Sequence, residues 1–257
     1  MHDPYAWPLD PDALLVVPAL CVAYVLLTRT HRSPPWRIAC FAAGMLLLLG
    51  VFATPLDTLA LHHLLSAHLL QNVVVAEWAP GLVALSLPSA LARRVHAPLV
   101  LALPLWLGTY FFWHIPAVYD FALEHHHTVL HLEHATYFAS GLMLWWPVVH
   151  GRYLPQTKAM YLFAAFVLAS PLGLLLALLP EPVYDFYEQR PTVWGLSHLT
   201  DQQLAGITMA AEQAVVFFAV FTWFFLRFLK DEERGDRVLP SREATAASSR
   251  PSPSSRS

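Results

Sequence analysis

The chain has 257 residues, of which 56% are hydrophobic and 13% are charged, and its mean hydropathy is +0.48. About a quarter of the residues of a typical soluble domain are charged, so this chain carries about half of that share. With a net charge of −3, this composition excludes a water-soluble globule, a disordered protein and a nucleic-acid-binding protein. Two cysteines cannot form a disulfide framework or a cysteine-rich metal site. We therefore predict an all-α, polytopic membrane helix bundle.

Seven apolar stretches approach the length of about 20 residues that a helix needs to cross the hydrocarbon core. In chain order they are residues 13–27, 38–53, 61–87, 99–113, 129–149, 159–179 and 204–229, the third being interrupted by Pro80-Gly81. We predict seven transmembrane helices in one domain, residues 1–230. Residues 231–257 are rich in Ser, Arg and Glu without apolar periodicity, which predicts a disordered cytoplasmic tail.

The basic residues test this count of helices. Fourteen of the fifteen fall in alternate connections or after the last stretch, and only Arg190 falls on the other side. The fourteen are Arg29, Arg32, Arg37, Arg93, Arg94, Arg152, Lys158, Arg227, Lys230, Arg234, Arg237, Arg242, Arg250 and Arg256. The positive-inside rule makes their side cytoplasmic. We therefore expect a multi-pass protein of the cell membrane, with its N-terminus outside and its C-terminus in the cytoplasm.

Most histidines lie on the outer side of this predicted topology. Eleven of the fourteen do so: His2, His62, His63, His68, His114, His125, His126, His127, His131, His134 and His198. Imidazole is the commonest metal ligand and the usual proton carrier, and nothing in bilayer solvation requires such a skew. The distribution indicates a site near the outer face.

The densest segment is EHHHTVLHLEH, residues 124–134. On one continuous helix Glu124, His127, His131 and His134 would share a face. His127 and His131 are one turn apart, a spacing that lets two imidazoles bind one ion, and Glu133 lies off that face and could orient a ligand. The alternative is an amphipathic helix entry whose histidines only sit at the membrane interface.

The third and fourth apolar stretches add further candidates. His68, Gln71 and Asn72 lie at i, i+3 and i+4, and polar groups inside a membrane helix usually face a partner or a cavity. Hydrogen bonding between helices is the alternative. His114 precedes Pro116 and is either a ligand or a residue that ends a helix.

Two carboxylates lie deeper, Glu77 in the third stretch and Glu212 in the last. Asp201 and Glu212 lie on one face of the last stretch, leading inward from the surface. Proton relay, metal ligation and a protonated structural hydrogen bond are all open for them. Cys21 and Cys40 are away from the histidines, so a metal site would have nitrogen and oxygen ligands, which suit Cu(II), Fe or Zn.

Three segments, residues 66–88, 113–148 and 196–209, together resemble the caa3-type cytochrome c oxidase assembly factors called CtaG. The first family motif, His-x-x-Gln-His before Ala-Pro, is matched at His68, Gln71 and Ala79-Pro80, with Asn72 in place of the second histidine. The other two motifs are matched at His114, Pro116, Tyr119, Asp120, His131, Glu133 and His134, and at Asp201, Gln202, Gln203, Ala205 and Gly206. The resemblance implies a multi-span protein that matures haem-copper oxidases by delivering copper.

The leading hypothesis from the sequence is therefore a membrane assembly factor. It would hold a metal, copper by the resemblance and zinc or iron as alternatives, and pass it to a haem-copper oxidase subunit. The resemblance and the histidine pattern nominate His68, His114, His131 and His134 as ligands, with Asp201, Glu133 and Gln71 as auxiliary groups.

Two rival hypotheses stay open. The first is a redox protein with a haem or metal between the helices, for which His68 and His131 could be axial ligands. The second is a proton- or ion-coupled transporter that uses Glu77 and Glu212. The sequence has no nucleophile elbow, phosphate loop or His-Glu-x-x-His motif, so we do not expect an enzyme.

Overall fold

The structure of the protein is a computed structural model that describes residues 3–8, 10–31, 33–92, 95 and 97–248, with side chains as far as residue 233. All regular secondary structure of these residues is helical. The residues Arg32, Arg93, Arg94, Arg250 and Arg256, on which the charge argument partly depends, and His2 and His96 lie outside the described residues.

The long helices lie in the apolar stretches that the sequence predicts, but the third stretch, residues 61–87, is broken at residues 63–64. The helices are η1 (Asp12–Val16), α1 (Val17–Thr28), α2 (Pro35–Phe52), α3 (Pro55–His62), α4 (Leu65–Val73), η2 (Val74–Trp78), α5 (Ala79–Ser86), α6 (Ser89–Ala92), α7 (Leu99–Trp113), α8 (Pro116–Glu124), α9 (Val129–Val149), α10 (Pro155–Leu178), α11 (Asp185–Glu188) and α12 (His198–Ser248). Here η marks π-helical turns, and the break in the third stretch lies between α3 and α4.

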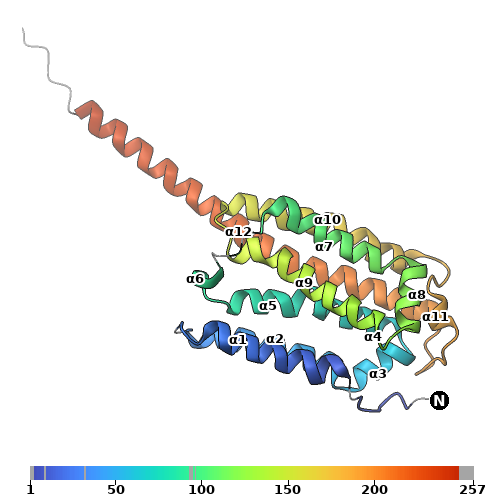
Figure 1. Ribbon diagram of the computed structural model, residues 1–257. Coiled ribbons are helices and arrows are strands. Elements are labelled where there is room, and N and C mark those ends of the chain that lie inside the picture. The colour runs from blue at the N-terminus through green and yellow to red at the C-terminus, as the bar shows by residue number, and fades with distance from the viewer. Residues whose placement is uncertain (1–2, 9, 32, 93–94, 96, 249–257) are drawn as a thin grey trace, which may run out of the picture.

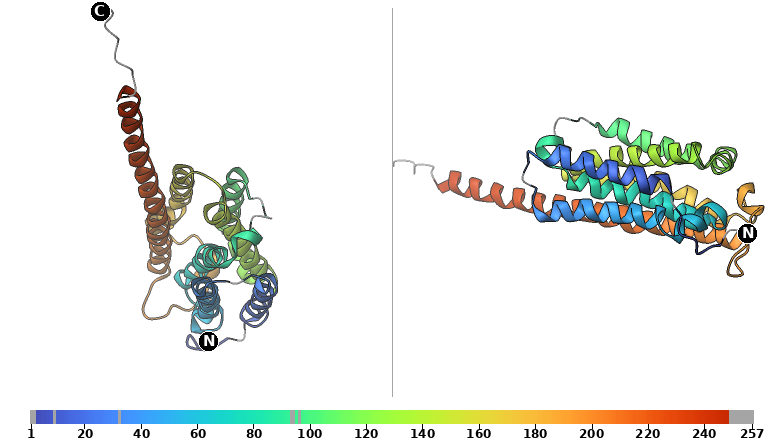
Figure 2. Two further views of the ribbon diagram at one scale, coloured as in Figure 1. Left: turned by 90° about the vertical axis from the view of Figure 1, so that its left-hand side faces the viewer. Right: turned by 60° about the horizontal axis from the view of Figure 1, so that its bottom comes forward.

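The long helices form a bundle with two distinct ends (Figures 1 and 2). We call the end formed by α3, α8, α11 and the N-terminal segment the histidine end. The opposite end carries α6, the α1–α2 and α9–α10 connections and the projecting part of α12, and we call it the basic end (Figure 1). Arg29, Arg37 and Arg152 lie at the basic end, whereas Arg190 follows α11 at the histidine end.

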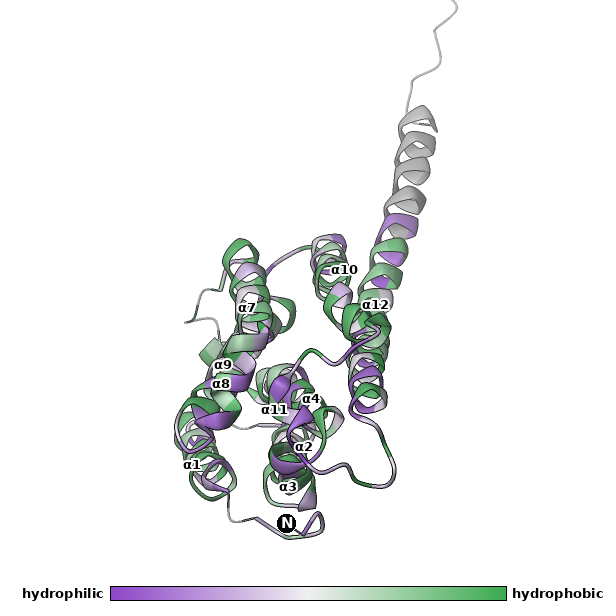
Figure 3. Cartoon of the chain, turned by 90° about the vertical axis from the view of Figure 1, so that its right-hand side faces the viewer, coloured by the Kyte–Doolittle hydropathy of each residue, from purple (hydrophilic) through white to green (hydrophobic). Residues whose placement is uncertain are grey.

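Four helical segments are long and apolar enough to cross a membrane: Pro35–Phe52, Leu65–Ser86, Pro155–Leu178 and His198–Glu233. A fifth is possible if α7 and α8, bent by 72°, form one span, and Asp12–Thr28 is a shorter apolar helix. Hydrophobic residues predominate along these helices (Figure 3). The structure thus has four to five candidate spans where the sequence predicts seven, because the first helix is short and α9 carries charged and imidazole side chains in its first turns.

Two boundaries differ from the sequence-based expectation. The predicted continuous helix through residues 124–134 is wrong, because α8 ends at Glu124 and a turn over residues 125–128 precedes α9. Three consecutive histidines are poor helix formers, and Thr128 leaves the helical region with φ −141°. At the other end of the chain, α12 continues past residue 230 as far as Ser248. The rest of the predicted tail lies outside the described residues.

A close seam between α9 and the η2–α5 segment fixes the position of α9. Pro80 has no N–H, so carbonyl groups one turn earlier lose their helical partner, and the chain widens into the π-helical turn η2. Trp145 donates its indole N–H to the carbonyl oxygen of Glu77 at 2.8 Å. Gly141 lies directly against the carbonyl of Ala76, where any Cβ would overlap the oxygen. This seam sets the height of the α9 histidines relative to α4.

Candidate metal centre

The strongest convergence of ligand-type side chains joins the start of η1 to α9. His131 and His134 are three residues apart on α9 and therefore share a face. Their Nδ1 atoms lie 3.0 and 2.8 Å from Oδ2 of Asp12. Within the described residues, Asp12, His131 and His134 are the one group of three or more His, Cys, Asp or Glu whose ligand atoms all lie within 4.8 Å of one another. We call this group the outer triad.

Contacts of the N-terminal segment bring Asp12 to the histidines. Thr58 of α3 donates a hydrogen bond to the carbonyl of Ala6 at 2.9 Å, and Trp194 donates to the hydroxyl of Tyr5 at 3.0 Å. Asp12 is not predicted from the sequence as a site residue, because its partners lie more than a hundred residues away. The signal that could have found it is the acidic N-terminal segment on the same predicted side as the histidines.

Further carboxylates surround the outer triad. Asp10 accepts a hydrogen bond from the backbone N–H of Asp12 at 2.6 Å, and Gln71 donates its amide to Asp57 at 2.8 Å. Burial, helped by the negative charges of Asp10 and Asp12 and opposed by the hydrogen bond from Gln71, raises the pKa of Asp57 to about 6. Burial also raises the pKa of Asp10. These carboxylates repel one another, so a cation at the outer triad would be favoured.

A second, fully buried cluster lies on the inner side of His134. The rings of His68 and His134 are 6.3 Å apart between centroids. His68 Nε2 lies 3.8 Å from Oε1 of Glu133, which also accepts a hydrogen bond from the Asn72 amide at 3.0 Å. His68, Asn72 and Glu133 are the sequence-predicted residues that the structure brings together here, and we call them the inner cluster.

The hydrogen bonds of three buried histidines fix which ring nitrogen carries a proton. Nδ1 of His134 faces the Asp12 carboxylate, Nδ1 of His114 lies 2.8 Å from the carbonyl of Tyr110, and Nδ1 of His68 lies 3.2 Å from the Tyr187 hydroxyl. An acceptor at Nδ1 holds the proton there and leaves a lone pair on Nε2. The Nε2 atoms of all three are buried without a hydrogen-bond partner among the described residues. This is the arrangement in which protein histidines bind metals.

His114 lies farther from the outer triad. It packs against Tyr119 and Tyr137, with ring centroids 6.1 and 6.4 Å away. The cavity that borders His114 and Asn72 has a volume of about 10 Å³, which is room for one water molecule. A haem macrocycle does not fit into that space.

The remaining predicted site residues lie elsewhere. His127 is exposed on the turn before α9, with its ring 3.9 Å from that of His126. Asp201 accepts hydrogen bonds from the backbone N–H groups of Leu65 and Ser66. It therefore anchors the N-terminus of α4 to α12, as a carboxylate at a helix N-terminus does.

Glu77 and Glu212 form a separate pair at depth. Trp78 donates its indole N–H to Glu212 at 2.5 Å, and Gln213 donates its amide to Glu77 at 3.3 Å and to the Tyr110 hydroxyl at 3.1 Å. The two carboxyl groups are close enough to interact with each other. This pair is not part of the outer triad, but Glu77 borders the same small cavity as Asn72 of the inner cluster and His114.

One of three comparisons with known proteins gives a match. Residues 20–231 match the family model described as cytochrome c oxidase caa3 assembly factor (Caa3_CtaG). A search of curated proteins and a search of solved structures found no match. The matched range includes α4, α9 and most of α12 and begins after Asp12.

Proposed function

Because the chain belongs to the cytochrome c oxidase caa3 assembly factor family, we propose that it holds copper at the outer triad for delivery to a haem-copper oxidase subunit. The observation that carries the proposal is the convergence of Asp12, His131 and His134. The metal is a cargo, bound reversibly, and the chain's own part is to offer ligands at an accessible place.

The chemistry of the donor set supports this proposal. Two imidazoles and a carboxylate suit Cu(II), Zn and Fe(II), and the family favours copper among them. The side chain of His131 is 25% exposed whereas that of His134 is 6% exposed. A metal could therefore arrive at His131 and be held by His134. Each Nδ1–H that faces Asp12 would give up its proton on binding, so loading would release protons.

The inner cluster is the second position that this function could use. His134 belongs to the outer triad through Nδ1, and its Nε2 is a buried lone-pair nitrogen beside His68. Together with Glu133, it offers a deeper set of nitrogen and oxygen donors. Copper bound there would be shielded from solvent, which suits a cargo that must be protected.

The topology that we propose has seven spans with the N-terminus outside. It places the histidine end at the outer face of the cell membrane and the basic end in the cytoplasm. The support is the separation of charges: Arg29, Arg37 and Arg152 lie at the basic end, as the positive-inside rule requires for a cytoplasmic face.

The rival hypotheses have less support. A haem between His68 and His131 has no support from the family match, which points to oxidase assembly. The Glu77–Glu212 pair that a transporter would use is not part of the outer triad, and the family match points to assembly and not to transport. We propose an assembly role without catalysis, since the family is one of assembly factors.

Copper binding to the purified full chain tests the proposal. The metal content and the electron paramagnetic resonance spectrum after loading with one equivalent of Cu(II) should show nitrogen ligation, and Asp12→Asn with His131→Ala should weaken binding by at least about tenfold, on the order of 1.4 kcal/mol. His125→Ala with His127→Ala is the matched control, because both side chains are exposed at the same end. Equal copper binding by both double variants would overturn the outer triad.

A third variant separates the two positions. If copper rests in the inner cluster, His68→Ala should remove nitrogen hyperfine lines while His131→Ala leaves them. If copper rests in the outer triad, the reverse should hold. Binding that survives in every variant would show that neither position holds the metal.

A further inference from the structure

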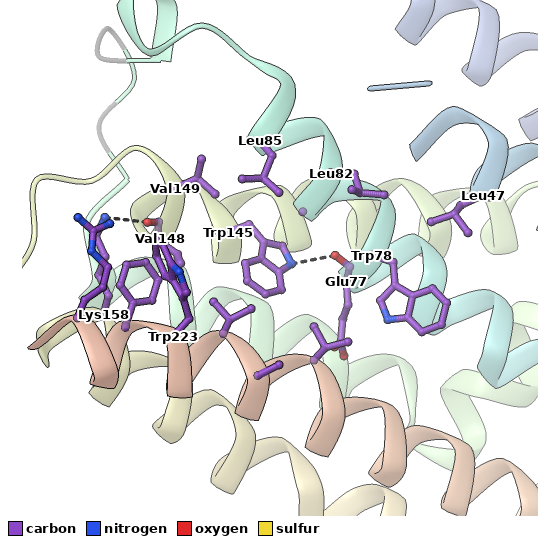
Figure 4. A pocket seen from close by; sticks show the side chains of 16 residues that line it. Leu47, Glu77, Trp78, Leu82, Leu85, Trp145, Val148, Val149, Lys158 and Trp223 are labelled. Atoms are coloured by element: carbon purple, nitrogen blue, oxygen red, sulfur yellow. Dashed lines mark hydrogen bonds between the residues drawn. The ribbon is translucent and has the colours of Figure 1, made fainter. Parts of the chain in front are cut away.

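A large apolar groove runs from the middle of the bundle to its basic end, away from the outer triad. It has a volume of about 730 Å³ and lies between α5, α9 and α12 (Figure 4). The lining residues that matter here are Glu77, Leu82, Trp145, Lys158, Ala219 and Arg227. This volume is in the range of small-molecule sites in proteins, and no role in metal binding accounts for it.

The polarity of the groove changes along its length. Its wall is formed by aliphatic and indole side chains, including Leu82, Trp145 and Val220. Lys158 lies at the basic end of the row of lining side chains, and Glu77 lies far from it, toward the middle of the bundle (Figure 4). The groove thus has one cationic end and a long apolar body, which is the complement of an anionic amphiphile.

Two cations share the basic end of the groove. Lys158 Nζ donates to the carbonyl of Val148 at 2.8 Å and lies 5.3 Å from the ring centroid of Phe224. The Arg227 guanidinium lies 4.9 Å from the ring centroid of Trp223. The two positive charges are close enough to repel each other.

Neither cation has a carboxylate partner within ion-pair distance in the part of the chain with described side chains, where every ion pair involves a histidine. Two neighbouring positive charges beside an apolar groove are stabilised by an anion between them. Basic pockets between membrane helices bind anionic lipid headgroups at the cytoplasmic interface. The charge of this site therefore specifies the kind of molecule that covers it.

We propose that the groove binds one anionic phospholipid of the cytoplasmic leaflet. The phosphate lies between Lys158 and Arg227, and an acyl chain runs along the apolar wall toward Glu77. A free phosphate ion would leave that wall uncovered. A zwitterionic lipid would place a third positive charge beside the two cations, so the site discriminates by net headgroup charge.

The bound lipid would bridge α10 and α12 at the basic end, since Lys158 lies in the first turn of α10 and Arg227 lies on α12. The acyl chain of the lipid would fill the space beside Trp145 of α9. The indole N–H of Trp145 donates to the carbonyl of Glu77 in the seam between α9 and η2. The lipid thus packs on the same seam that fixes α9 and its histidines.

Native mass spectrometry of the detergent-purified full chain tests the charge specificity. Titration with phosphatidylglycerol should give one lipid bound more tightly than phosphatidylcholine. Each basic residue contributes about 1 kcal/mol to attraction for anionic lipid, so Lys158→Gln with Arg227→Gln should weaken phosphatidylglycerol binding by about 30-fold. Arg29→Gln with Arg152→Gln removes two exposed charges at the same end and should leave it unchanged.

A steric variant tests the groove without changing charge. Ala219→Trp would fill the groove that Ala219 lines, and it should abolish binding of the single lipid. Val215→Trp is its control, because Val215 lies one turn earlier on α12, 69% exposed, and outside the groove lining.

Three results would overturn the proposal. They are equal binding of both lipids, retention of the phosphatidylglycerol adduct in the charge variant, and retention of that adduct in Ala219→Trp. Displacement of the lipid by millimolar inorganic phosphate would show an anion site without a lipid groove, which also contradicts the proposal.

Discussion

The carboxyl group of Asp57 gives the histidine end a pH-dependent stability. Burial raises its pKa from 3.8 to about 6 in the folded chain, so unfolding releases a proton between these values. A raised pKa contributes stability that is present below the unfolded pKa and is lost as the pH rises through about 6. We expect the melting temperature in detergent to fall between pH 4.5 and 7, with a loss of at most about 3 kcal/mol from this group.

Thermal melts of Asp57→Asn, followed by circular dichroism, check this expectation. The asparagine side chain does not ionise but still offers an oxygen to Gln71, so the melting temperature of this variant should depend less on pH over the same range. Glu124→Gln, which changes an exposed carboxyl group at the same end, should retain the full dependence. Parallel pH profiles for the native chain and Asp57→Asn would contradict the assigned pKa.

At the residue scale, the sequence predicts which side chains could bind a metal better than it predicts which of them lie together. His131 and His134 are three residues apart on one helix, so the sequence alone correctly predicts that they share a face. Their partner Asp12 is distant in sequence, and only the packing of the N-terminal segment reveals it. The sequence predicts His68 and Asn72 as polar groups that face a partner or a cavity, and Glu133 as a residue that orients a ligand. The structure places the three side chains in contact. His127 does not share a face with His131 and His134, because α8 ends at Glu124 and His127 lies on the turn before α9 begins.

At the scale of the elements, the seam between α9 and η2 makes Gly141 a sensitive position. A methyl group there would overlap the Ala76 carbonyl, so Gly141→Ala should separate α9 from η2. We expect a destabilisation of about 3 kcal/mol, at the upper end of the usual cost of overpacking. Denaturant titration in mixed micelles, with the melting temperature as a second readout, would measure it.

Gly108 of α7 provides the matched control. It has no atom within 4 Å of the position that a Cβ would occupy, so Gly108→Ala should be neutral or stabilise the helix by up to about 1 kcal/mol. Because the seam also sets the height of the histidines, Gly141→Ala should weaken copper binding while Gly108→Ala does not. Equal stability of the two variants would show that the seam yields at little cost.

The helices themselves were predictable because apolar length is a local property of the sequence. Six of the seven apolar stretches are each almost wholly helical. The third, residues 61–87, is broken at residues 63–64 between α3 and α4, whereas the helix continues through Pro80-Gly81, where the sequence predicts an interruption, with only the π-helical turn η2 before it. The break between α8 and α9 was not foreseen, since periodicity alone extends a helix through residues 125–128. Hydropathy therefore predicts where the helices lie, whereas the three consecutive histidines, which are poor helix formers, account for the end of α8 at Glu124.

At the scale of the whole molecule, the proposed topology predicts which end of the bundle meets the outside. In a chain with Cys21→Ala and Cys40→Ala, a membrane-impermeant maleimide should label Thr192→Cys in intact cells. Arg152→Cys should react only after the cells are permeabilised. Both positions are exposed and lie at opposite ends, so accessibility in the folded chain is matched.

The opposite labelling pattern would reverse the orientation and place the histidines in the cytoplasm. Labelling of both positions in intact cells would contradict the single span, α10, that the proposed topology places between them. The number of spans is where the sequence and the structure differ most. The charge alternation favours seven, while four to five segments pass by length and hydropathy. The polar side chains of α9 account for part of this difference, because they lower its hydropathy without preventing it from packing inside the bundle.

The outer triad also constrains the order of events during biosynthesis. Asp12 is separated from His131 and His134 by 119 and 122 residues, so the ribosome has produced half of the chain before these three side chains can meet. Helices α1 to α8 must already be made when α9 closes the triad. In the proposed function, copper loading at this site therefore has to follow the synthesis of α9, and a nascent chain arrested before α9 should be unable to capture the ion.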